Sequence, residues 1–202
     1  MIANHDIAGC ILAGGQSRRM GEDKARFHLG GVMLLKRAIE RLTPQVAAVV
    51  INVHEETPDL ARYRLPVVED ATGDHQGPLA GLLAALFWAQ ENHFAWIATV
   101  AVDTPFFPRD LVPRLADAAH DRDMAVARSG GRLHPVFGLW RTTLLSDLAT
   151  FIKGGSRSVH HWADSHVAGI AEWPARPYDP FFNINEPDDV STALLIEVEH
   201  HP

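Results

Sequence analysis

The feature that most constrains this chain is a regular alternation of short apolar runs with segments of helical spacing. Apolar runs of strand length lie at residues 7–12, 46–53, 65–68 and 96–102. Apolar positions recur at helical spacing in residues 34–42, 79–90 and 111–120. Strands that are apolar throughout are typical of parallel sheets covered on both faces, and right-handed crossovers then give a doubly wound arrangement. We therefore predict an α/β fold with a doubly wound, mostly parallel sheet and helices on both faces.

The second half of the chain is less regular. We expect strands at residues 124–128 and 133–140, helices at 141–151 and 156–163, and a further strand at 166–173. A final helix should open near Asn185, with Asn185 as its cap, Pro187 in its first turn and Asp188 placed for a capping box. The length of 202 residues suits a single domain over residues 1–202.

Composition excludes several classes of protein. The formal net charge of −7 argues against binding along a nucleic-acid backbone. No apolar run is long enough for a membrane helix, and the N-terminus lacks the basic start of a signal peptide. Cys10 is the only cysteine, so no intrachain disulfide can form, and we expect a cytoplasmic protein. The paired histidines lack the spacing of a zinc helix, so we do not expect a zinc site.

Polar residues follow the predicted strands at one edge of the sheet. Ligands of doubly wound sheets bind beyond the carboxyl ends of the strands, where Asn52, Asp70 and Asp103 are expected. Gly14 and Gly15 follow the first strand and allow a tight turn whose N–H groups can face an anion. This loop is neither a Walker A loop nor a G-x-G-x-x-G fingerprint. Its cations, which could neutralise a triphosphate, are Arg18, Arg19 and Lys24.

The glycine loop carries a resemblance to a known family. The run Leu12-Ala13-Gly14-Gly15-Gln16-Ser17-Arg18-Arg19-Met20-Gly21-Glu22-Asp23-Lys24 resembles the signature of the molybdenum cofactor guanylyltransferases, the MobA type. Four further motifs resemble family patterns, namely Gly77-Pro78-Leu79-Ala80-Gly81, Asp103-Thr104-Pro105, His134-Pro135-Val136-Phe137-Gly138-Leu139-Trp140 and Phe182-Asn183-Ile184-Asn185. The resemblance covers nearly the whole chain and implies the Rossmann-like fold of nucleotidyltransferases.

The resemblance also implies an activity and a set of site residues. GMP would pass from GTP to the molybdenum-pterin cofactor with release of pyrophosphate, and Mg²⁺ would be held by Asp103. The implied catalytic residues are Lys24, Arg19 and Asp103. The implied GTP-binding residues are Leu12, Ala13, Gly14, Gly15, Lys24, Asn52, Asp70 and Asp103, and the acceptor-binding residues are Gly77, Gly81, Asn183 and Asn185. Residues 1–105 would then form about the nucleotide-binding half, and residues 106–202 the acceptor-binding half. Cofactor-insertion chaperones or molybdoenzymes are conceivable protein partners.

Three alternative functions stay open at this point. Cytidylyl transfer to the same cofactor, or nucleotidyl transfer to a sugar phosphate, would use the same fold. Asp23-Lys24 and the motif that begins at Gly77 favour guanylyl transfer. A carrier that binds GTP or cofactor without catalysis would be expected to lack Asp103 or Lys24, and both are present.

Overall fold

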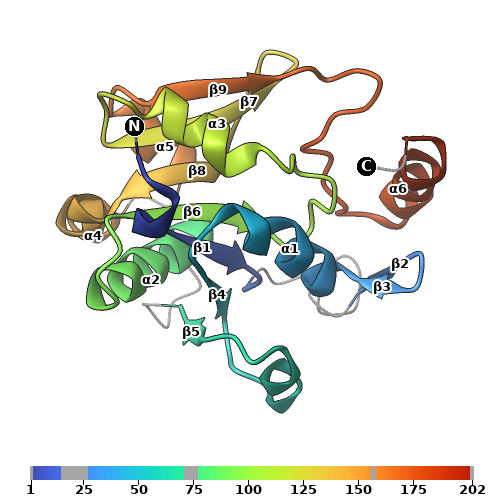
Figure 1. The fold of residues 1–202 in the computed structure, drawn as a ribbon, viewed down its shortest axis with the longest axis horizontal. Helices are drawn as coiled ribbons and strands as arrows, with labels where there is room; N and C mark the ends of the chain where they lie inside the picture. The colour runs from blue at the N-terminus through green and yellow to red at the C-terminus, as the bar shows by residue number, and fades with distance from the viewer. Residues whose placement is uncertain (1, 15–26, 71–76, 156–157, 201–202) are drawn as a thin grey trace.

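The computed structural model describes residues 2–14, 27–70, 77–155 and 158–200. Within them a central sheet has seven strands in the order β5-β4-β1-β6-β8-β7-β9, which Figure 1 shows from bottom to top. The strands are β1 (Ile7–Leu12), β4 (Ala48–Val53), β5 (Val67–Glu69), β6 (Trp96–Ala101), β7 (Met124–Ser129), β8 (Arg132–Arg141) and β9 (Gly169–Trp173). Neighbouring strands are parallel except for β8, which is antiparallel to both β6 and β7. The predicted mostly parallel sheet is therefore confirmed.

Helices cover both faces of the sheet. They are α1 (Leu34–Leu42), α2 (Pro78–Glu91), α3 (Leu111–Ala118), α4 (Leu145–Lys153), α5 (Val159–Asp164) and α6 (Pro187–His200). One apolar core lies between the sheet and α1 and α3, and a second lies between the sheet and α2, α4 and α5. The residues of β1 alternate between the cores, with Ile7 and Ile11 in the first and Ala8 and Cys10 in the second. This strand is thus buried on both faces, as its unbroken apolar sequence predicts.

Smaller elements connect this frame. A hairpin of β2 (His28–Leu29) and β3 (Val32–Met33) stands at the right of Figure 1 beside α6. Short 3-10 helices lie at η1 (Asn4–Asp6), η3 (Thr43–Gln45), η4 (Pro58–Tyr63) and η5 (Thr142–Leu144). Among the described residues, no helix is long and apolar enough to cross a bilayer.

Several predicted boundaries were wrong. The helix expected from residue 141 begins at Leu145, after η5, and the strand expected from 166 begins at Gly169. Helix α5 begins at Val159, where the Ser158 hydroxyl accepts the His161 N–H, and the first two residues of the predicted helix lie outside the described part of the chain. The hairpin was not predicted, because two-residue strands carry no readable periodicity.

The start of α6 also differs from the prediction. The first helical residue is Pro187, so Glu186 precedes the helix and not Asn185. The Asp189 carboxylate, three residues further on, accepts the N–H groups of Glu186 at 2.9 Å and Asn185 at 2.8 Å. Asp189 therefore closes the capping box that was assigned to Asp188, because the helix starts one residue later than expected.

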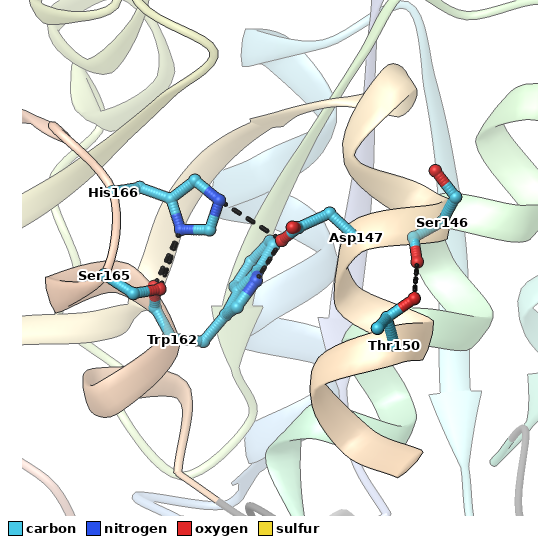
Figure 2. Close-up of polar contacts among 6 residues, drawn as sticks. All are labelled: Ser146, Asp147, Thr150, Trp162, Ser165 and His166. Carbon is cyan, nitrogen blue, oxygen red and sulfur yellow. Dashed lines mark hydrogen bonds and ion pairs between the residues drawn. The ribbon is translucent and has the colours of Figure 1, made fainter. Parts of the chain in front are cut away.

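A cluster of serine, histidine and aspartate side chains joins α4 to α5 (Figure 2). The Asp147 carboxylate accepts the Trp162 indole N–H at 2.7 Å and lies 3.1 Å from Nε2 of His166. The Ser165 hydroxyl donates to the carbonyl of Trp162 at 2.7 Å. Because its one proton is used in that bond, Ser165 is not arranged as a nucleophile, and the cluster serves to pack the two helices.

Candidate active site

The carboxyl ends of β1, β4, β5 and β6 lie together at one edge of the sheet. Backbone hydrogen bonds continue past the ends of these strands, from the Ala13 N–H to the Asn52 carbonyl at 2.8 Å and from the Val102 N–H to the Leu12 carbonyl at 3.2 Å. The Asp70 N–H likewise donates to the Val53 carbonyl at 3.0 Å. The carboxyl ends of four parallel strands therefore bring the expected polar residues together.

Gly14 lies against the Asp70 carboxylate. A Cβ on Gly14 would come within 3.1 Å of the His54 backbone nitrogen and 3.4 Å of Oδ2 of Asp70, so only glycine fits without displacing these groups. The same carboxylate oxygen lies 3.5 Å from Nδ1 of His54. The side chain of Asp70 is 11% exposed, so part of it is accessible to solvent.

Asn52 holds this carboxylate in place. Its side chain is almost fully buried, at 2% exposure, and its amide N–H₂ donates to Oδ1 of Asp70 at 3.1 Å and to the Val68 carbonyl at 3.4 Å. Its amide oxygen faces Gly81 in the first turn of α2, where a Cβ would approach to 2.3 Å. Asn52 is therefore a support for Asp70, and the absence of a side chain at Gly81 lets α2 approach the sheet there. This places Gly81 beside the residues expected to bind GTP.

The loop after β6 carries Asp103 and is anchored from α1. Arg41 is buried, and its guanidinium donates to the carbonyls of Phe107 at 2.8 Å and Phe106 at 3.4 Å. Burial lowers the pKa of Arg41 to about 10, helped by the nearby positive charge of Arg109, so the side chain stays charged at neutral pH. Charge-assisted bonds to backbone carbonyls fix the loop that presents the Asp103 carboxylate.

Gln45 adds further bonds to the same loop. Its amide nitrogen donates to the Pro108 carbonyl at 3.2 Å, and its amide oxygen accepts the Val112 N–H at 2.9 Å. The first turn of α3 is thereby joined to η3. Asp103 itself is half-buried, and the Thr104 hydroxyl lies 3.4 Å from its Oδ1.

The segment with the two asparagines reaches Asp103 from the far end of the sequence. The Ile184 N–H donates to the Asp103 carbonyl at 2.9 Å, and the Ile184 side chain is fully buried. Asn183 and Asn185 flank this anchor and are exposed. The structure therefore brings these asparagines to the Asp103 loop, although some 80 residues separate them in the chain.

The remaining predicted residues are placed only in part. Gly15, Arg19 and Lys24 lie outside the described residues, so their roles stay predictions. Gly77 is exposed and directly precedes α2. Leu12 ends β1 and contacts the core below α2, and Ala13 is buried beyond it.

The donor chemistry at Asp103 fits a hard divalent cation. A half-buried carboxylate at the end of a strand offers the oxygen ligand that magnesium prefers, and magnesium usually completes its shell with phosphates and water. Within the described residues, no three histidine, cysteine, aspartate or glutamate side chains gather into a metal-binding group.

Sequence reasoning missed the supporting residues of this site. His54 could have been noticed, because it lies two residues beyond Asn52 and directly after the strand that carries Asn52. Arg41 and Gln45 gave no signal, since they bond to backbone groups more than 60 residues away and their own segment looks like an ordinary amphipathic helix.

Comparisons with known proteins identify the family of the chain. Residues 9–168 match the family model of the MobA-like NTP transferase domain. A molybdenum cofactor guanylyltransferase from Rhizobium johnstonii is 44% identical over 93% of this chain and 91% of its own length. A second, from Nitrobacter hamburgensis, is 41% identical over 92% of this chain and 91% of its own.

Solved structures have the same fold. The molybdopterin-guanine dinucleotide biosynthesis protein A from Archaeoglobus fulgidus superposes with a TM-score of 0.74 at 25% identity, covering 95% of this chain and 99% of that one. The 4-diphosphocytidyl-2C-methyl-D-erythritol synthase from Anaerococcus prevotii has a TM-score of 0.75 at 10% identity, over 97% of each chain, which speaks for the fold alone. From its matched domain and its close relatives over nine-tenths of its length, the chain belongs to the molybdenum cofactor guanylyltransferase family of MobA-like nucleotidyltransferases.

Proposed function

We propose that this chain transfers GMP from GTP to the molybdenum-pterin cofactor and releases pyrophosphate. The observation that carries the proposal is the meeting of the Gly14 turn, the Asn52–Asp70 pair and the Asp103 loop at one sheet edge. Relatives named for this reaction, at 41–44% identity, support the choice of substrates.

The residues of the first half would bind GTP. Guanine presents N1–H and N2–H₂ donors, and the Asp70 carboxylate, held by Asn52, is a suitable acceptor. The backbone from Leu12 to Gly15 would lie against the nucleotide, and Lys24 and Arg19 would neutralise its phosphates. Catalysis then consists of aligning the acceptor phosphate with the α-phosphate and stabilising the charge that develops.

Asp103 would hold Mg²⁺ together with the phosphates and water. Bound there, the ion would supply positive charge next to the reacting phosphates. The chain's own contribution is to fix the carboxylate, through the bonds of Arg41 and Gln45 to the loop that follows it.

The acceptor would lie on the side of Asn183 and Asn185, with Gly77 and Gly81 at the start of α2. This arrangement corresponds to a nucleotide-binding half over about residues 1–105 and an acceptor-binding half over about residues 106–202. We further propose a cytoplasmic location, which suits a chain whose one cysteine is a buried free thiol. Chaperones or molybdoenzymes that collect the product are proposed as partners on the same basis.

A nucleotide competition assay tests the function. Purified protein, magnesium and molybdenum cofactor are incubated with GTP, CTP or ATP, and pyrophosphate release is measured. We expect release with GTP alone. Release with CTP alone would assign the chain to cytidylyl transfer, and tight GTP binding without release from any nucleotide would indicate a carrier.

A further inference from the structure

A second cluster of serine, histidine and aspartate lies at the β7–β8 hairpin, on the acceptor side of the sheet. Ser129 ends β7 and is 1% exposed, and its hydroxyl oxygen lies 2.7 Å from Oδ1 of Asp179 and 2.8 Å from Nε2 of His134. Asp179 belongs to the segment between β9 and α6. The cluster therefore connects that segment to two strands of the central sheet.

The directions of these hydrogen bonds follow from proton counting. An ionised carboxylate can only accept, so the single Ser129 proton goes to Asp179. The Ser129 oxygen then accepts from His134, which must carry its proton on Nε2. A serine that donates to a carboxylate and receives from histidine has the reverse of the polarity that a nucleophile requires. The cluster is a fixed network and not a catalytic triad.

Asp179 also shapes the turn that follows it. Its Oδ1 accepts the Phe181 N–H at 3.0 Å, and its carbonyl accepts the Phe182 N–H at 3.0 Å, which closes a turn with Pro180 at the second position. The Phe181 ring is 4% exposed and stacks on the His134 ring, with centroids 4.6 Å apart. The first and third residues of the turn are thus held by the network.

This turn leads directly into the asparagine segment. Three residues after Phe181, the Ile184 N–H donates to the Asp103 carbonyl, and exposed Asn183 and Asn185 lie on either side. The segment is anchored to Asp103 through Ile184 and to the first turn of α6 through the bond from the Asn185 N–H to Asp189. The network at Ser129 holds its other end, so losing the network would loosen the start of the segment.

We propose that Ser129, His134 and Asp179 are positioning residues that set residues 181–185 for the acceptor substrate and leave GTP binding untouched. The proposal rests on the proposed function, because it takes Asn183 and Asn185 to face the acceptor. It adds a specific prediction: the network should determine the KM for the molybdenum-pterin cofactor but not the affinity for GTP. A merely structural role would disturb both.

Steady-state kinetics test this with Ser129→Ala, which removes the centre of the network while filling nearly the same space. Both hydrogen bonds of the hydroxyl are lost, and we expect the acceptor KM to rise about tenfold, with the Kd for GTP changed less than about twofold. Ser165→Ala is the matched control, because it removes a serine–histidine contact of the same kind between α5 and the turn after it. Its kinetics should equal those of the wild type.

Two substitutions at His134 separate hydrogen bonding from bulk. His134→Gln keeps an N–H donor for Ser129, and its acceptor KM should stay within about threefold of the wild-type value. His134→Leu fills similar space without a donor, and its acceptor KM should match that of Ser129→Ala. Equal loss in both variants, or a parallel loss of GTP affinity, would overturn the proposal.

Amide hydrogen exchange gives a readout that does not depend on turnover. In Ser129→Ala the N–H groups of Phe181 and Ile184 should exchange faster than in the wild type, while those of β1 stay protected. Unchanged exchange at both would also refute the network's role. If the wild type transfers no GMP, the proposed function fails, and the exchange result still decides whether the network holds this segment.

Discussion

In the Asn52–Asp70 pair, a single buried amide holds a carboxylate in place at the candidate site. Asn52 is buried, and its N–H₂ group points at Oδ1 of Asp70 from 3.1 Å. That bond satisfies Oδ1 of a carboxylate that is largely withdrawn from water. We expect the rest of the carboxylate to accept hydrogen bonds from a ligand.

Asn52→Asp replaces that donor by a second carboxylate. We expect the free energy of unfolding to fall by about 2–4 kcal/mol at neutral pH and GTP affinity to fall at least about tenfold, because two buried like charges would face each other. Both losses should shrink on acidification, when one carboxyl takes up a proton. Denaturant titration and isothermal calorimetry measure them.

Asn92→Asp, at an exposed amide that bonds to the Trp88 carbonyl, is the control and should cost less than about 1 kcal/mol. Equal effects of the two substitutions would contradict the argument.

At the scale of elements, α1 and η3 support the loop that carries Asp103. Arg41→Leu removes the donors for two buried carbonyls, so we expect unfolding free energy to drop by about 2–4 kcal/mol. Metal-dependent transfer should weaken more than GTP binding in the absence of metal, because the Asp103 loop is loosened while the Asn52–Asp70 pair is not. Thermal unfolding and transfer assays check this.

The control for that substitution is Arg122→Leu. Arg122 also donates to a backbone carbonyl, that of Val167, but is exposed. Water can replace an exposed bond, so the loss should stay within about 1 kcal/mol. A loss as large as that of Arg41→Leu would show that burial is not what makes the Arg41 bonds strong.

The elements differ in how far the sequence alone could predict them. Strands buried on both faces, such as β1 and β4, can be recognised from their apolar runs. The carboxyl ends of the predicted strands then locate Asn52, Asp70 and Asp103. The insertion of β8 between β6 and β7 depends on pairing between distant segments, which no local pattern encodes. For the same reason the network of Ser129 with Asp179, 50 residues apart, could not be read before the fold was known.

At the scale of the whole molecule, ligand binding at this edge should stabilise the entire fold. A ligand that binds only the native state raises the melting temperature, by an amount that grows with the logarithm of the ligand concentration divided by Kd. GTP with magnesium should therefore raise the Tm of the wild type more than GTP alone.

In Asp103→Asn the magnesium-dependent part of this rise in Tm should disappear, and the rate of transfer should fall about 10²-fold or more. Asp121→Asn, an exposed aspartate before β7, should behave as the wild type. A magnesium-dependent rise retained in Asp103→Asn would refute the metal assignment.

The stability of the molecule should also depend on pH through His134. Burial lowers the pKa of His134 below its ordinary 6.5, and Arg132 lowers it further, while Asp179 opposes them. The unfolded chain thus binds a proton at a pH where the native state does not, so unfolding free energy should fall as pH drops below about 6.5 and level off below the native pKa.

His134→Gln keeps a donor for Ser129 but cannot titrate. Denaturant titrations between about pH 8 and about pH 5 should therefore show a shallower decline for the variant. A variant that loses stability as steeply as the wild type would mean that His134 is not the source of this dependence, and that its burial against Phe181 does not penalise the charged ring.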